Sequence, residues 1–180
     1  MKDPARLIKA MRRPWANGHD ADLLIVGPGM KQLANGAHMT SDRITLSGQR
    51  HDIAEWLPGL DLPVLPSVSG EAFPNIIGEA MASGAACVAN HIGDSRTIVG
   101  EDGLEVPPGK PEAMRAAIAQ FLCLSPDARC ALGLAAHARP IQLFSLPTIA
   151  QHYAALHGSV IDSWQSWFNV NVTLGAPGVA

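Results

Sequence analysis

The sequence lacks the features of several protein classes. Its 13 Lys and Arg residues stand against 16 Asp and Glu residues, so the formal net charge is −3. Nucleic acids and anionic lipids bind clustered positive charge, and this chain has no basic excess to offer them. No apolar run approaches the roughly 20 residues that span a bilayer. The N-terminus, MKDPARLIKAMRR, has no signal-peptide pattern. We therefore expect no nucleic-acid partner and a cytoplasmic location.

Cysteine and histidine are too sparsely placed for the usual metal motifs. The 3 cysteines form no CxxC pair and lie in apolar or helical surroundings, which is typical of reduced structural cysteines. The 7 histidines show no pairing at ligand spacing, and no DxD-like pair stands in a loop. His91 alone is placed to face a cleft, and we expect it to be an ordinary loop histidine with its polar groups satisfied. The sequence therefore predicts no metal and no cofactor.

What the chain does contain is enough apolar material for one packed domain. It has 180 residues, of which 47% are hydrophobic and 16% charged, as in a compact globule. Short apolar runs that suit buried strands occur at 22–29, 43–48, 62–67, 86–90 and 104–108. Helical patterns occur at 4–13, 30–38, 51–57, 74–83, 95–100, 110–124, 125–139 and 145–160. This alternation predicts an α/β fold, with a Rossmann-like parallel sheet and helices on both faces.

Residues 70–84, GEAFPNIIGEAMASG, place two carboxylates around the start of a helix. Glu71 follows a strand directly, at the end of the sheet where such folds bind ligands. At 100° per residue the apolar side chains of the helix share an arc of about 140°, and Glu79 lies outside it. Helical side chains lean toward the N-terminus, so we expect Glu79 to reach back toward Glu71.

The same helix end offers backbone donors. The amides of Asn75 and Ile76 are free in the first turn and carry the positive end of the helix dipole. Amides that bind phosphate, beside carboxylates that accept hydroxyl hydrogen bonds, suit a nucleotide sugar. The ordinary alternative is a solvent-facing Glu79 and a loop Glu71 with no shared ligand. The residues alone leave both interpretations open.

A wider stretch, LPSVSGEAFPNIIGEAMASGAACVANHIGDSRTIVGEDGLEVPPGKPEAM, resembles the C-terminal, donor-binding domain of a GT-B glycosyltransferase. More narrowly it resembles the retaining family GT4, whose hallmark is two glutamates with seven residues between them, here Glu71 and Glu79. Four flanking segments resemble the family in the same order: KDPARLIKAM, LLIVGPG, LSGQRHDIAEWLPGLDLPVLPS and ARPIQLFSLPTIAQHYAALH. The resemblance covers residues 2–157 and implies the C-terminal half of a GT-B fold.

The resemblance implies a role for each matching residue. Glu71 is implied to be catalytic and to contact hydroxyls of the transferred sugar, and Glu79 to contact the ribose of the donor nucleotide. Lys2 is implied to neutralise the leaving diphosphate, and Arg50 and His51 to lie at the nucleobase. The implied donor-binding set is Lys2, Arg50, His51, Glu71, Ala72, Phe73, Asn75 and Glu79.

The implied reaction moves a hexose from a nucleotide diphosphate sugar to a glycan or a lipid-linked acceptor, with retention and without a metal. The diphosphate is then stabilised by basic side chains and helix-terminal amides. The chain departs from the family in three ways. Ala72 stands where a Gly is usual, and Asp94 and Thr97 replace a Gly and a Glu. The third departure is that the first strand of the domain, the arginine that partners Lys2 and the N-terminal acceptor domain have no counterpart.

We therefore expect residues 1–162 to form the nucleotide-sugar-binding domain of a larger two-domain enzyme. That enzyme would be peripheral to a membrane, and the chain alone inactive. The alternative is a catalytically silent Rossmann-like interaction module. An epimerase of the related two-domain kind fits the fold but not the stretch at 70–84.

Residues 163–180 form a tail with a strand-like segment. From 168 to 174 apolar and polar residues alternate, which is the period of a strand. The family strand that this chain lacks is an interior one, and open strand edges invite pairing with another chain. We predict that 168–174 fill this gap, in their own sheet or by self-association with a neighbour. A disordered tail is the alternative.

Overall fold

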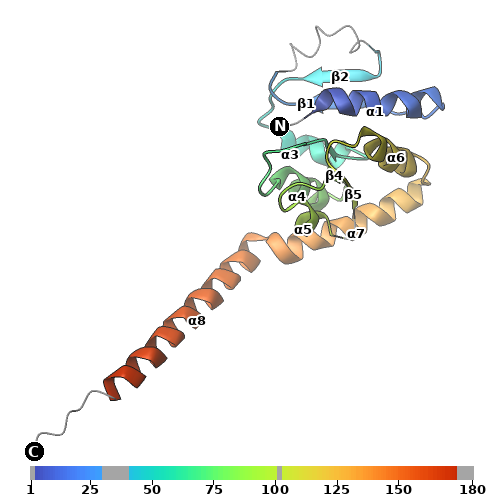
Figure 1. Cartoon of the computed structure of the whole chain (residues 1–180). Coiled ribbons are helices and arrows are strands. Elements are labelled where there is room, and N and C mark those ends of the chain that lie inside the picture. Colours follow the sequence, from blue (N-terminus) through green and yellow to red (C-terminus); the bar gives the residue numbers. More distant parts are fainter. Residues whose placement is uncertain (1–2, 30–40, 101–102, 174–180) are drawn as a thin grey trace, which may run out of the picture. The chain divides into compact units, whose positions relative to one another are not determined.

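The computed structural model describes residues 3–29, 41–100 and 103–173. The chain divides into two compact units, Met1–Ile141 and Gln142–Ala180. The second consists mainly of one long helix (Figure 1).

Two parallel sheets form the centre of the first unit. One pairs β1 (Leu23–Val26) with β2 (Ile44–Ser47). The other contains β3 (Val64–Leu65), β4 (Val88–Asn90) and β5 (Leu104–Val106), in that order. Each strand lies within its predicted range. The predicted α/β fold with parallel strands is confirmed.

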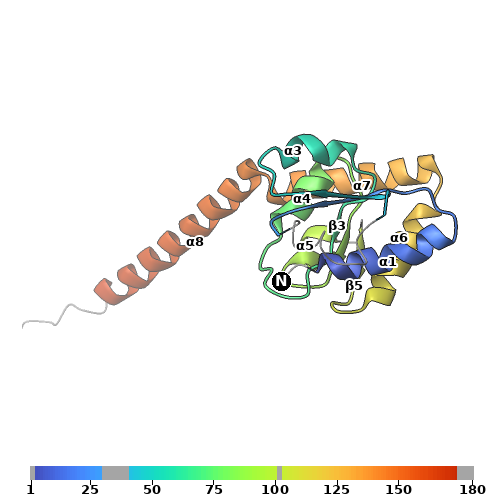
Figure 2. The same ribbon diagram turned by 90° about the horizontal axis from the view of Figure 1, so that it is seen from above.

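Helices flank both sheets (Figure 2). In the first unit the helices are, in chain order, α1 (Pro4–Ala16), α3 (Ile53–Trp56), the 3-10 helix η1 (Leu57–Gly59), α4 (Asn75–Ala82), α5 (Ser95–Val99), α6 (Pro111–Leu122) and most of α7 (Pro126–Phe144). The long helix of the second unit is α8 (Leu146–Thr173). The predicted helix at 30–38 lies outside the described residues.

Helix α1 starts as expected, because Oδ1 of Asp3 accepts a hydrogen bond from the Arg6 amide at 3.1 Å and Pro4 occupies the first turn.

One apolar core connects the two sheets. The core joins α1, α6 and residues of β1, β4 and β5; it contains Leu7, Ile8, Met11, Leu23, Ile25, Val88, Val106, Met114 and Ile118. Burying a side chain of this size contributes about 1.5–3 kcal/mol. Since the strands are short, this shared core holds the unit together.

Helix α7 secures the ends of α4 and α5. Nδ1 of His137 lies 2.6 Å from the carbonyl oxygen of Ala82, the last residue of α4. The guanidinium of Arg139 donates to the carbonyl oxygens of Ile98 at 3.0 Å and Thr97 at 2.8 Å, near the end of α5. These bonds satisfy carbonyls that a helix leaves open at its C-terminus.

The tail contradicts the strand prediction. Residues 168–173 are the last turns of α8, so the strand predicted there is wrong, and Leu174 lies outside the described residues. A helix already running from Leu146 extends at little further cost, and this outweighs a short alternating pattern. None of the helices in the described part of the chain is both long enough and apolar enough to cross a membrane.

Candidate functional site

The stretch at 70–84 lies where the sequence predicts it, at the carboxyl end of β3. Helix α4 buries Ile77, Ala80 and Met81, while Glu79 is exposed in its second turn. The predicted apolar face is thus confirmed, with Ile76 half-buried at its margin. The glutamate therefore stays in solvent, as the helical spacing requires.

The start of α4 is open to a ligand. Pro74 occupies the N-cap position and no side chain caps the helix there. Asn75, its first residue, is exposed, and Phe73 before it is 42% exposed. The first-turn amides and the positive end of the helix dipole are thus available to an anion.

Glu71 is held in place by a serine. The hydroxyl of Ser67 donates to Oε1 of Glu71 at 2.6 Å, a length typical of a strong bond to a carboxylate. Ser67 is only 1% exposed, so it has little freedom to move. The Glu71 carboxylate is therefore fixed just ahead of α4 rather than mobile in a loop.

Ser67 belongs to a buried polar network that joins all three strands of its sheet. Nδ2 of Asn90 donates to the Ser67 carbonyl oxygen at 2.6 Å. The Ser95 hydroxyl lies 2.9 Å from the Asn90 carbonyl oxygen and 3.1 Å from Oε1 of Glu105, and accepts from the Ile92 amide. Buried polar groups that are all hydrogen-bonded define one geometry.

Sequence reasoning missed this network. Ser67 and Asn90 are 23 residues apart, and no local pattern pairs them. The available signal was a polar residue at the end of each apolar run, in LPVLPS and ACVAN. His91 lies beside the network, with Nδ1 3.6 Å from Oε2 of Glu105.

The loop after β4 supports the loop that carries Glu71. The Asp94 amide donates to the Ala72 carbonyl oxygen at 2.8 Å. Gly93 has φ +58, and a Cβ there would collide with the carbonyl oxygens of Glu71 and Ala72. Glycine is therefore required at 93. No described residue other than glycine has a positive φ, so the methyl group of Ala72 causes no backbone strain.

Arg50 and His51, which are predicted to lie at the nucleobase, belong to a different part of the first unit. Arg50 makes a bidentate pair with Asp52, its Nε 2.8 Å from Oδ1, and its guanidinium lies 4.6 Å from the centre of the Trp56 ring. The hydrogen bond from Arg50 lowers the pKa of Asp52. His51 is exposed, and Lys2 lies outside the described residues. In the part of the chain that the structure describes, no three His, Cys, Asp or Glu side chains gather as a metal site requires.

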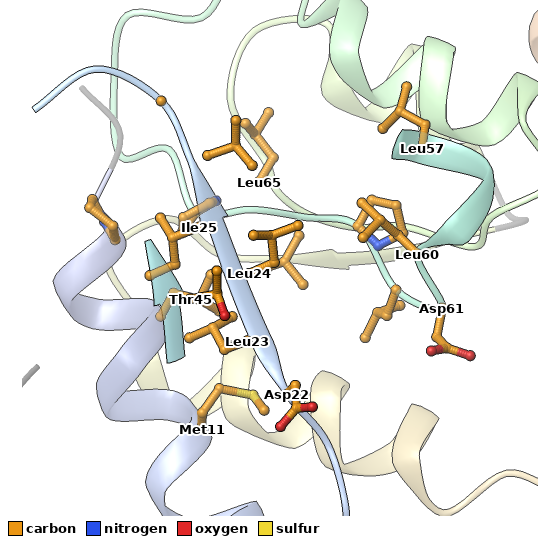
Figure 3. A pocket seen from close by; sticks show the side chains of 18 of the residues that line it. Met11, Asp22, Leu23, Leu24, Ile25, Thr45, Leu57, Leu60, Asp61 and Leu65 are labelled. Atoms are coloured by element: carbon orange, nitrogen blue, oxygen red, sulfur yellow. The ribbon is translucent and has the colours of Figure 1, made fainter. Parts of the chain in front are cut away.

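A cavity of about 1390 Å³ lies elsewhere in the first unit (Figure 3). It is lined by residues of β1, by the segment 59–66 and by helices on either side, and neither Glu71 nor Glu79 takes part. The glutamates themselves therefore do not line the cavity, although Ile76 and Ile77 of α4 and the predicted donor residue Arg50 do.

Comparison with known proteins adds a family and a fold. Residues 1–123 match the model of the family described as glycosyl transferases group 1. An exopolysaccharide phosphotransferase of Streptomyces coelicolor is 38% identical over 104 residues, which are 53% of this chain and 11% of that protein. A phosphatidyl-myo-inositol mannosyltransferase of Mycobacterium tuberculosis is 33% identical over 126 residues, 67% of this chain and 33% of that protein.

Among solved structures, the Anabaena protein HepE in complex with UDP superposes with a TM-score of 0.73 and 25% identity. The match covers 88% of this chain and 45% of HepE. The chain thus spans a third or less of these curated relatives and less than half of this solved one.

Proposed function

The chain belongs to the glycosyl transferases group 1 family, and from this premise we propose that its first unit binds the nucleotide diphosphate sugar that serves as donor. The predicted resemblance to the C-terminal domain of a GT-B glycosyltransferase is confirmed by the family match and by the shared fold. Donor binding is supported by one arrangement above all. Ser67 fixes Glu71 before the uncapped start of α4, and Glu79 is exposed in the second turn of that helix.

The diphosphate binds at the start of α4. The first-turn amides, together with the helix dipole, favour an anion at this position. The same groups stabilise the charge that develops as the diphosphate leaves, which is why the transfer needs no metal in this proposal. Lys2 helps to neutralise the negative charge of the leaving diphosphate.

The two glutamates divide the donor between them. Glu79 accepts hydrogen bonds from the ribose hydroxyls, and Glu71 accepts them from the sugar that is transferred. The held position of Glu71 favours this division, because a fixed acceptor orients a sugar better than a mobile one. Arg50 and His51 lie at the nucleobase and contact it through their backbone.

The donor that we propose to test first is a UDP-hexose. Solved complexes of HepE contain UDP and UDP-glucose, which supports this choice. The acceptor is a glycan or a lipid-linked sugar, and the hexose is transferred with retention. The two curated relatives carry different activities in their names.

The 180-residue chain alone is not expected to transfer sugar. Transfer requires donor and acceptor to be held in near-attack geometry, and the chain matches only 45% of HepE. Product formation by the purified chain, with UDP-glucose and any acceptor, would contradict this part of the proposal.

Isothermal titration with UDP and UDP-glucose tests donor binding. Glu79→Ala should lower the affinity for both ligands about tenfold or more, since a hydrogen bond to a charged group contributes about 1.5–3 kcal/mol. Glu71→Ala should weaken UDP-glucose but leave UDP unchanged. Asp127→Ala, which removes an exposed carboxylate from the first turn of α7, is the matched control.

Two results would count against the proposal. Equal weakening of free UDP by both glutamate variants would show that the division of roles is wrong. A folded chain that binds none of UDP, GDP and ADP would favour the silent interaction module.

A further inference from the structure

Helix α1 carries all of its positive charge on one side. Residues 4–16 contain four Lys and Arg residues and no Asp or Glu. At 100° per residue these four exposed cations fall within an arc of about 120°: Arg6, Lys9, Arg12 and Arg13. The buried residues of the helix fall on its other side: Leu7, Ile8, Ala10, Met11 and Pro14. The helix is therefore apolar toward the core and cationic toward solvent.

The start of α6 adds a fifth cation to this side of the molecule. Helix α1 packs against α6 (Figure 2). Lys110, the N-cap residue of α6, is exposed and lines the same small hollow as Arg6. A Cβ added at Gly109 would lie 3.3 Å from a guanidinium nitrogen of Arg6, so the turn before α6 adjoins the start of α1. We call the surface formed by these five residues the basic face: Arg6, Lys9, Arg12, Arg13 and Lys110.

Most charges of the basic face are not neutralised by the protein itself. Arg6 pairs with Asp3, its Nε 2.7 Å from Oδ2. In the part of the chain that the structure describes, no carboxylate forms an ion pair with the other four cations. Residues three or four apart on a helix have Cβ atoms about 5–6 Å apart, which is within the Debye length of about 8 Å at physiological salt. The fields of these cations therefore add.

The distribution of charge gives the first unit a preferred orientation near an anionic surface. The whole chain has a net charge of −3, although α1 contains only cations. Acidic residues are thus concentrated outside α1. An anionic surface attracts the basic face and repels the acidic remainder, so the two effects orient the molecule in the same sense. The net charge of the chain does not describe this face.

The composition of the basic face favours a lipid surface over a nucleic acid. Within the cationic arc of α1 the remaining residues are Ala5 and Ala16. Proteins that read nucleic acids use polar side chains on base edges or aromatic side chains that stack on bases, and this arc has neither kind. Cations on the outer side of a helix, with only small residues between them, can all approach a plane of phosphate head groups at once.

The basic face begins beside the proposed donor site. The Asp3 amide donates to the Pro66 carbonyl oxygen at 3.2 Å, so α1 starts next to the carboxyl end of β3, where Glu71 also lies. Asn90 of the polar network lines the hollow that Arg6 and Lys110 share. An acceptor carried by a surface on this face would thus lie on the same side of the unit as the donor.

We propose that the basic face is a docking surface for a lipid bilayer with anionic head groups. Its cations bind lipid phosphates, and α1 lies along the plane of the bilayer while its apolar side stays in the protein core. The docking rests on the charges of α1 and Lys110 and is independent of donor binding. Its use in sugar transfer rests on the proposed function, so either proposal can fail without the other.

Co-sedimentation of the 180-residue chain with lipid vesicles tests the docking. An equal mixture of phosphatidylglycerol and phosphatidylcholine should bind the chain about tenfold or more tightly than phosphatidylcholine alone. Raising the salt concentration from about 50 to about 500 mM should remove this difference, because the Debye length then becomes shorter than the spacing of the charges. Titration calorimetry with UDP on the same preparation reports donor binding separately.

Substitutions on exposed positions locate the contact. Arg13→Gln should lower the affinity for the anionic vesicles about fivefold, and Lys9→Gln combined with Arg13→Gln about tenfold or more, since each Lys or Arg near an anionic surface contributes separately. Lys9→Arg keeps the charge and should bind as the original chain does. The matched control is Arg96→Gln, which removes an exposed arginine from the last turn of α5 as Arg13→Gln does from α1. It should leave binding unchanged.

Three results would overturn the proposal. Equal binding to vesicles of phosphatidylcholine alone would assign the contact to an apolar surface, such as the exposed side of α8, instead of the basic face. Equal losses in Arg13→Gln and Arg96→Gln would show that only the net charge matters. A DNA duplex, added at the same concentration of phosphate groups, that removes the chain from the anionic vesicles would identify a nucleic acid as the partner.

Discussion

The two sheets of the first unit differ in how completely they are enclosed. All three residues of β4 are buried, and α4, α5 and α6 pack around its sheet. No residue of β2 is fully buried, and β1 alternates between buried and half-buried. The glutamate site belongs to the enclosed sheet, where a polar network fixes each loop. The site that we propose for the donor thus depends on the part of the fold with the fewest alternative arrangements.

The largest expected difference between the sheets is in core stability. Met81→Ala should lower the free energy of unfolding by about 2–5 kcal/mol, because Met81 is fully buried and its truncation leaves a cavity in the core. Leu46→Ala in the half-buried β2 should cost about 1 kcal/mol. Denaturant unfolding followed by circular dichroism measures both. Equal losses would remove the distinction between the sheets.

A glycine at each sheet gives the next comparison. Gly93→Ala should cost about 1–3 kcal/mol, because alanine must adopt a positive φ there and meets the carbonyl oxygens of the Glu71 loop. Gly48, which follows β2, has no atom within 4 Å of an added Cβ, so Gly48→Ala should be nearly neutral. Thermal unfolding of the two variants checks this. A neutral Gly93→Ala would show that the two loops are not tightly packed.

A serine pair tests whether the network serves the ligand. Ser67→Ala removes the donor that fixes Glu71, and should weaken UDP-glucose binding about fivefold while leaving UDP unchanged. Ser47 ends β2 and is half-buried, and Ser47→Ala should alter neither. Titration calorimetry with both ligands is the measurement. A loss of UDP affinity in Ser67→Ala would mean that the serine acts on the whole site rather than through Glu71.

The smallest effect requires no substitution. Burial raises the pKa of Cys87, directly before β4, to about 12, whereas Cys123 and Cys130 are exposed. At pH 8 a thiol reagent should therefore modify two of the three cysteines, because Cys87 has almost no thiolate. Mass spectrometry of the folded and the denatured chain counts the labels. Rapid labelling of Cys87 in the folded chain would show that the enclosed sheet opens readily.

The same pKa shift gives a dependence of stability on pH. The folded thiol keeps its proton above the usual pKa of 9.0, where the unfolded thiol loses it. The folded state then binds more protons, so stability falls as the pH rises from 9 toward 12 and is unaffected below that range. Denaturant unfolding at pH 8 and at pH 10 should show the decline, and Cys87→Ala should reduce it.

Local patterns predicted much of this structure. The short apolar runs became the five described strands, and the spacing of Ile77, Ala80 and Met81 correctly left Glu79 in solvent. Contacts between distant segments were beyond such patterns. The hydrogen bonds from Asn90 to Ser67 and from Arg139 to Ile98 of α5 span 23 and 41 residues and depend on how distant segments pack. The strand predicted at 168–174 is wrong for a related reason. The alternation of apolar and polar residues is local, whereas α8 begins at Leu146 and continues into this segment.

The hydrogen bonds that join α7 to the ends of α4 and α5 have a mechanical consequence. His137 and Arg139 lie two residues apart and hold the far ends of the two helices whose near ends adjoin the glutamate loop and the loop of Gly93. A tilt of α7 would therefore displace α4 and α5 in the same direction, and the two loops at their starts would move together. Separate sliding of either loop would require breaking its anchor first.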